Sequence, residues 1–125
     1  MAYNIEKAIA GYRISCNLLF SGGFMAFYIL HPKELKLVER EKRAIVVDLR
    51  ERSAYRKYHY KNAVSMPYCD DENWLNYFCR ENKYILYCDY GNISLLVARK
   101  LSQRGISAYT VLGGAKELQH YTEQI

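Results

Sequence analysis

Apolar residues along the chain follow two alternating patterns. Short apolar runs rich in β-branched and aromatic residues are typical of buried strands, and they cover residues 27–30, 44–48, 63–67, 84–87 and 108–112. Between these runs, apolar residues at helical spacing and helix-start signals predict helices over residues 32–38, 51–58, 71–78, 92–104 and 115–124. The alternation predicts an α/β fold, with a mostly parallel central sheet of about five strands and helices on both faces. In such sheets, ligands bind at the carboxyl ends of the strands.

The first 23 residues form a segment of their own. Apolar residues from Ile5 to Leu19 recur at three- and four-residue steps, and Gly22-Gly23 follows, which predicts a helix that ends there. Three roles are open for this helix. It can pack on the domain, pair two chains in a homodimer through residues 1–23, or lie on a membrane surface.

A membrane-spanning segment is not expected from this region. A spanning helix needs about 20 apolar residues, whereas the apolar run of residues 14–30 is shorter and is interrupted by polar residues and two glycines. No convincing small-residue cleavage site follows it. We therefore expect an N-terminal helical extension over residues 1–25 and a single domain over residues 26–125.

The most informative stretch joins a strand to a helix through a cysteine. Cys88 follows the fourth apolar run, and a short polar loop containing Gly91 leads from it into an amphipathic helix that Gly105 ends. Ser94 or Asn92 can cap the start of this helix. Backbone N–H groups of the loop and the helix N-terminus both favour negative charge on sulfur, so we expect a reactive thiol. From the local pattern alone, a small apolar cysteine that closes a strand is an equal alternative.

The composition indicates which binding partners and which cellular compartment to expect. The chain carries 18 basic and 13 acidic residues, a net charge of +5 that favours anionic small molecules or acidic protein surfaces. Its basic residues are spread out without a recognisable nucleic-acid motif, so we expect no specific nucleic-acid partner. Its four cysteines form no C-x-x-C pair and have no histidine at metal-ligand spacing, which argues against a disulfide scaffold and a zinc site. We expect a reducing, cytoplasmic setting.

Several short motifs follow one another in an order that resembles the rhodanese family. The likeness runs from about residue 28 to residue 118, and its motifs are Asp48-Leu49-Arg50, Tyr55, His59, Ala63-Val64, Met66-Pro67, the loop Cys88-Asp89-Tyr90-Gly91-Asn92-Ile93-Ser94 and the closing turn Leu112-Gly113-Gly114. Many motifs in one order are far more specific than a lone cysteine. Tyr58 and Asn62 replace the glycines around the family histidine, and asparagine accepts a left-handed turn more readily than tyrosine does.

The resemblance implies a rhodanese-like sulfurtransferase. Cys88 would take a sulfane sulfur from a small donor, thiosulfate or a persulfide, and pass it to a thiol or protein acceptor. A ring of backbone amides would stabilise the thiolate and the persulfide anion, and by the match these belong to Asp89, Tyr90, Gly91, Asn92, Ile93 and Ser94. No metal or organic cofactor is needed. Beside the sheet's carboxyl edge, Asp48 and Arg50 are expected to form a supporting ion pair.

Two departures from the family pattern change the expected donor. Ile93 stands where the family commonly has arginine, and Asp89 adds negative charge beside the cysteine, so both oppose an anionic donor such as thiosulfate. A protein persulfide or a small thiol carrier is the better candidate. The same departures support an alternative class, a rhodanese-like binding module that does little chemistry. A cysteine phosphatase needs Cys-x5-Arg, and Ser94 occupies that arginine position, which disfavours a phosphatase.

The other cysteines and the histidines are expected to have structural or surface roles. Cys69 ends another strand, on the same edge as Cys88 if the sheet is parallel, and is either a resolving thiol or a partly buried bystander. Cys16 and Cys79 are expected to be bystanders. The histidines expected to be structural or exposed are His31, His59 and His120.

Overall fold

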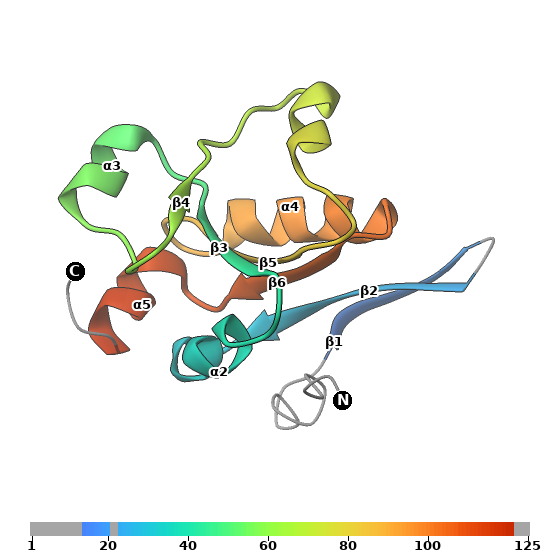
Figure 1. The fold of residues 1–125 in the computed structure, drawn as a ribbon, viewed down its shortest axis with the longest axis horizontal. Helices are drawn as coiled ribbons and strands as arrows, with labels where there is room; N and C mark the ends of the chain where they lie inside the picture. The colour runs from blue at the N-terminus through green and yellow to red at the C-terminus, as the bar shows by residue number, and fades with distance from the viewer. Residues whose placement is uncertain (1–13, 21–22, 122–125) are drawn as a thin grey trace.

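The computed structural model describes residues 14–20 and 23–121. Within them the chain forms a six-stranded sheet in the order β1-β2-β6-β5-β3-β4. The strands are β1 Ile14–Phe20, β2 Gly23–Leu30, β3 Ala44–Asp48, β4 Val64–Ser65, β5 Lys83–Tyr87 and β6 Ser107–Val111. Neighbouring strands pair in parallel along the series β2, β6, β5, β3 and β4, as the sequence predicts. Strand β1 pairs antiparallel with β2 at one edge of the sheet (Figure 1).

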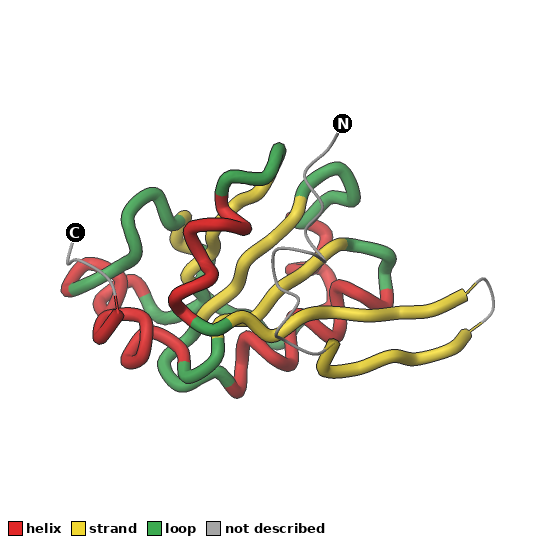
Figure 2. Tube along the Cα trace, turned by 90° about the horizontal axis from the view of Figure 1, so that it is seen from below, coloured by secondary structure: helices red, strands yellow, loops and turns green. Residues whose placement is uncertain are grey.

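Helical segments cover both faces of this sheet. They are η1 Pro32–Glu34, α2 Leu35–Glu39, α3 Arg52–Lys57, η2 Glu72–Tyr77, α4 Asn92–Gln103 and α5 Gly114–Tyr121. Buried side chains of α2 and α5 belong to the core on one face, and those of η2 and α4 belong to the core on the other (Figure 1). The β1–β2 pair extends past the helical layers (Figure 2).

The two cores explain why the strand sequences are apolar throughout. Val46 and Val47 are neighbours in β3, yet each is buried in a different core. Ile85 and Leu86 divide in the same way in β5. Because successive side chains of a strand point to opposite faces, a strand covered on both sides has no polar face. The predicted sheet with helices on both faces is confirmed.

The helix predicted over residues 1–23 is wrong where the structure describes that segment. Residues 14–20 form strand β1, and they pair with β2 from Ile14 opposite Tyr28 to Phe20 opposite Gly23. This pairing gives backbone partners to an edge of β2 that would otherwise be open, and that gain outweighs the helical spacing of the apolar residues. Residues 1–13 and 21–22 lie outside the described part. The domain division at residue 25 stays a prediction, and β2 runs across it.

Two smaller differences have local causes. The strand predicted over residues 63–67 is shortened to Val64–Ser65, because Pro67 has no N–H to donate to a neighbouring strand. The helix predicted over residues 71–78 is the 3-10 helix η2, capped by the Asp71 carboxylate, which accepts a hydrogen bond from Asn73 N at 2.9 Å.

A helix that spans a bilayer needs about 20 mostly apolar residues, and the helices of the described region are shorter than that. None of those helices could cross a membrane.

Candidate active site

The loop after β5 is built around a glycine in a left-handed conformation. Gly91 has φ of 106° and is the N-cap of α4, a backbone conformation that residues with a side chain rarely adopt. The prediction that Ser94 or Asn92 caps this helix is wrong, since the cap has no side-chain hydrogen bond. The Ser94 hydroxyl instead bonds Gly91 O at 3.2 Å and the Thr110 hydroxyl at 2.6 Å. Gly105, with φ of 78°, follows the end of α4 as predicted.

The cysteine sulfur lies inside this loop. Cys88 is buried, and its Sγ accepts hydrogen bonds from Gly91 N at 3.2 Å and from Ser94 N at 3.3 Å. Asn92 Oδ1 and Ser94 Oγ lie 3.8 and 3.6 Å from the sulfur. Two amide donors that converge on one sulfur atom, one of them in the first turn of α4, favour negative charge there.

The six predicted cradle residues divide into two groups. Gly91 and Ser94 donate their backbone N–H groups to the sulfur as predicted, whereas Asn92 contacts it through the side-chain oxygen Oδ1. For Asp89, Tyr90 and Ile93, no hydrogen bond to the sulfur occurs within the described residues. The Asp89 side chain is exposed, the Tyr90 ring is 68% exposed beneath Lys116 Nζ, and Ile93 packs against the core of the α4 face.

A second glycine turn closes the loop from the side of α5. Gly113 and Gly114 have φ of 80° and 68°, and Ala115 N donates a hydrogen bond of 2.7 Å to Cys88 O. A Cβ on Gly114 would lie 2.6 Å from Cys88 O and 2.5 Å from Asp89 O. The turn therefore packs its backbone directly on the cysteine loop, and glycine is needed for that approach.

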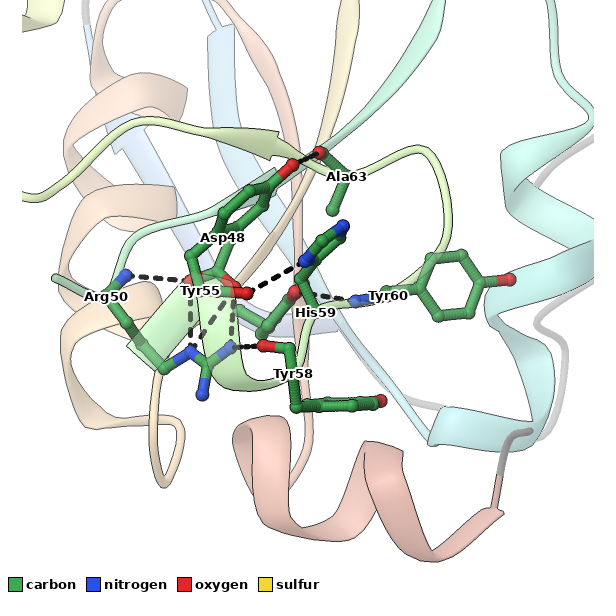
Figure 3. Close-up of polar contacts among 8 residues, drawn as sticks. Asp48, Arg50, Tyr55, Tyr58, His59, Tyr60 and Ala63 are labelled. Atoms are coloured by element: carbon green, nitrogen blue, oxygen red, sulfur yellow. Dashed lines mark hydrogen bonds and ion pairs between the residues drawn. The ribbon is translucent and has the colours of Figure 1, made fainter. Parts of the chain in front are cut away.

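The predicted ion pair between Asp48 and Arg50 is present and buried. The Arg50 guanidinium donates to the Asp48 carboxylate through Nε at 3.0 Å and Nη2 at 2.7 Å, and Nη2 also donates to Tyr58 O (Figure 3). Burial lowers the pKa of Arg50, but the hydrogen bonds and negative charge of Asp48 outweigh burial, so this pKa is raised. Leu49 N donates to Tyr87 O at 2.9 Å, which links the pair's segment to the residue before Cys88.

The segment between α3 and β4 is held by aromatic and backbone contacts. Tyr55 donates its hydroxyl to Ala63 O at 2.7 Å, and the His59 ring stacks on the Tyr55 ring with 3.9 Å between centroids (Figure 3). His59 Nδ1 also lies 2.8 Å from Tyr55 O. Asn62 has φ of 71°, the left-handed turn that the sequence suggested. These contacts give His59 a structural role.

Two hydroxyl-bearing residues of the site were missed from the sequence. Tyr87 is fully buried, and its hydroxyl accepts a hydrogen bond from Tyr60 N at 3.0 Å. Burial and then the charge of Asp48 raise the pKa of Tyr87. Thr110 is buried in β6 and bonds the Ser94 hydroxyl. A polar residue inside an otherwise apolar run was the available signal for Thr110.

An open apolar pocket of about 220 Å³ lies beside the loop. It shares Gly91 and Asn92 with the loop, and its apolar walls include Leu95, Val111 and Leu112. Leu112 is 52% exposed. Apolar surface thus reaches the solvent next to the loop that holds the cysteine.

The remaining thiols and histidines lie elsewhere in the structure. Cys69 and Cys79 are exposed rather than partly buried. His31 Nδ1 accepts a hydrogen bond from Lys33 N at 3.1 Å, and the rings of His31 and His120 both pack edge-on against Tyr121. In the described part of the chain, no group of three His, Cys, Asp or Glu side chains could hold a metal ion.

Comparison with known proteins agrees with this geometry. The family model of the Rhodanese-like domain matches residues 31–120, so the chain belongs to this family. The chain is similar to the tRNA sulfurtransferase of Thermoplasma acidophilum, with 40% identity over 68 residues, and to that of Pyrobaculum aerophilum, with 32% identity over 80 residues. These matches cover 54% and 64% of this chain but 14% and 16% of the relatives.

Solved structures show the same fold. A rhodanese-related protein from Thermoplasma volcanium superposes with a TM-score of 0.66 at 23% identity, covering 77% of this chain and 95% of that one. A rhodanese-like domain protein from Staphylococcus aureus gives 0.62 at 27% identity, with coverages of 72% and 89%. The rhodanese-like fold expected from the sequence is confirmed.

Proposed function

We propose that this chain is a sulfurtransferase that carries sulfane sulfur as a persulfide on Cys88. The observation that carries the proposal is the convergence of Gly91 N and Ser94 N on Sγ. The same donors can stabilise the thiolate before transfer and a persulfide anion after it. Membership of the rhodanese-like family and the likeness to proteins named tRNA sulfurtransferase support this reading.

The transfer needs no outside oxidant. The Cys88 thiolate attacks the outer sulfur of a donor persulfide, a new S–S bond forms, and the donor's S–S bond breaks with its electron pair leaving on the donor thiolate. An acceptor thiolate then attacks the terminal sulfur of the Cys88 persulfide in the same manner, which restores the Cys88 thiolate. The sulfane sulfur moves from donor to acceptor without net oxidation.

Three features favour a persulfide of a protein or small thiol over thiosulfate as the donor. Ile93 supplies no cation at the loop, and Asp89 is exposed next to the cysteine. The pocket beside Gly91 and Asn92 has apolar walls, which suit an organic group better than a sulfonate. Thiosulfate carries two negative charges that nothing in this loop's side chains offsets.

Sulfur-transfer rates to an acceptor thiol test the proposal directly. The donors are thiosulfate and a small organic persulfide, and the variants are Cys88→Ser and, as controls, Cys69→Ser and Cys79→Ser, which remove exposed thiols. We expect Cys88→Ser to abolish transfer, the controls to retain it, and the persulfide to be the faster donor. Ile93→Arg is expected to improve thiosulfate relative to the persulfide.

The alternative is a binding module that uses the same surface. The exposed Tyr90 and Leu112 beside the apolar pocket favour contact with a partner protein. If the unsubstituted chain transfers sulfur from neither donor, while it and Cys88→Ser bind a partner equally well, this alternative replaces the sulfurtransferase.

A further inference from the structure

The fold gathers three cationic side chains around a second pocket, away from the cysteine loop. This pocket has a volume of about 330 Å³, and Lys36, Arg40 and Lys61 line it. Lys36 lies in α2 and Arg40 is the C-cap of that helix, four residues later, so both lie on one face. Lys61 comes from the turn before β4. The sequence separates these charges by up to 25 positions, and the fold brings them together.

These three cations are not neutralised by the protein. All three are exposed, and within residues 14–20 and 23–121 none of them forms an ion pair. The carboxylate in the pocket lining is Glu39, and its Oε1 accepts a hydrogen bond of 2.7 Å from the buried Tyr60 hydroxyl. The pocket therefore has an excess of positive charge, with its carboxylate engaged by the protein.

The backbone of the Lys61 side of the pocket is fixed. Asn62 occupies the left-handed region, and Ala63 N donates to Tyr60 O at 2.9 Å to close the turn. Tyr60 N donates in turn to the Tyr87 hydroxyl, and Figure 3 shows the Tyr60 ring pointing away from Arg50. A turn held in this way presents Lys61 and Asn62 to a ligand without first having to become ordered.

We propose that this pocket binds a phosphate group. The planar fork of Arg40 can donate two parallel hydrogen bonds to phosphate oxygens, and two lysines add charge for a dianion or a phosphodiester chain. The phosphate belongs either to a free phosphorylated molecule or to the backbone of an RNA. Phosphate binding here is separate from sulfur transfer, since no residue of the cysteine loop lines this pocket.

Two probes test the site and distinguish its sources of phosphate. Binding of pyrophosphate is measured by calorimetry, and binding of a short single-stranded RNA by fluorescence anisotropy across a range of salt concentrations. The test variant is Arg40→Gln with Lys61→Gln. The control is Arg52→Gln with Arg99→Gln, which removes the same charge from two exposed arginines that do not line the pocket.

We expect the test variant to weaken binding about tenfold for at least one probe and, for RNA, to lower the slope of log affinity against log salt by about 1.5. The control is expected to change either value less than twofold. Loss with RNA assigns a phosphodiester ligand, and loss with pyrophosphate alone assigns a free phosphate compound. Equal effects of the two variants, or no binding of either probe, would overturn the proposal. Sulfur transfer by the test variant, measured separately, is expected to stay unchanged.

Discussion

At the scale of single residues, the buried pair of Asp48 and Arg50 supports the strand end beside the cysteine. Its side chains are 0% and 8% exposed, so removing one partner leaves the other charge buried and uncompensated. We expect Asp48→Asn to lower the free energy of unfolding by about 3 kcal/mol in urea denaturation.

A matched carboxylate on the surface gives the control for this prediction. Asp70 lies 3.9 Å from Lys100 Nζ, and its side chain is 85% exposed. Asp70→Asn should therefore change stability far less, because solvent screens the pair. Equal losses in the two variants would show that burial does not govern the strength of the Asp48–Arg50 pair.

Two buried tyrosines are expected to make the folded protein less stable at alkaline pH. Burial raises the pKa values of both Tyr87 and Tyr60, helped by the charge of Asp48 at Tyr87 and by the hydrogen bond to Glu39 at Tyr60. In the unfolded chain both titrate near 10, as a free tyrosine does to within roughly a unit. Above that pH the unfolded state loses protons that the folded state keeps, so stability is present below about pH 10 and falls above it.

We expect the loss from Tyr87 to approach about 1.4 kcal/mol per pH unit above pH 10. Denaturation measured at several alkaline pH values gives the slope of stability against pH in the wild type and in Tyr87→Phe, where it should be smaller and only the contribution of Tyr60 should remain. Tyr77→Phe is the control, since that side chain is 75% exposed. An unchanged slope in Tyr87→Phe would contradict the prediction, whatever the variant's stability at neutral pH.

At the scale of elements, the glycine turn before α5 holds the cysteine loop in place. Gly114→Ala would put a Cβ 2.6 Å from Cys88 O at a left-handed position. We expect it to destabilise the protein by more than about 2 kcal/mol and to impair sulfur loading of Cys88. Urea denaturation and mass spectrometry measure the two effects.

Gly105→Ala separates backbone strain from steric contact. Gly105 has a similar φ of 78°, but a Cβ added there would have Arg80 Nε as its nearest atom, 3.7 Å away. Gly105→Ala should lower the free energy of unfolding by about 1 kcal/mol, because alanine is disfavoured in the left-handed backbone conformation. It should leave sulfur loading of Cys88 intact. If both variants load sulfur normally, the turn does not position the loop.

Elements with a strong local pattern could be predicted from the sequence, and elements that depend on distant pairing could not. The apolar pattern predicts strand β3 at its observed bounds and the helix after Cys88 to within a residue or two. The apolar spacing of strand β1 predicts a helix, because its pairing with β2 is a tertiary interaction that the spacing does not report.

The candidate site shows the same division. The cysteine loop is contiguous in sequence, so its position after a strand and before a helix could be predicted. The hydrogen bond between Ser94 and Thr110 joins residues 16 positions apart, and the pocket of Lys36, Arg40 and Lys61 joins a helix to a later turn. Such contacts depend on the order of the strands in the sheet, and no short stretch of the sequence indicates them.

At the scale of the whole molecule, the parallel sheet explains why these parts meet. Strands β3 and β5 run side by side, so the Asp48–Arg50 segment and Cys88 leave the sheet at the same edge. Helix α4 then covers one face and α5 the other, and the turn before α5 reaches back to Cys88 O. We therefore predict that sulfur chemistry is confined to this edge, at one of the chain's four cysteines.

The intact mass of the purified protein after incubation with a small organic persulfide tests this claim most directly. We predict an increase equal to one sulfur atom, which is lost on treatment with a reducing thiol and absent in Cys88→Ser. The Cys69→Ser and Cys79→Ser variants should gain the same mass as the wild type. Sulfur loading that persists in Cys88→Ser, or no loading of the wild type, would contradict a persulfide carried on Cys88.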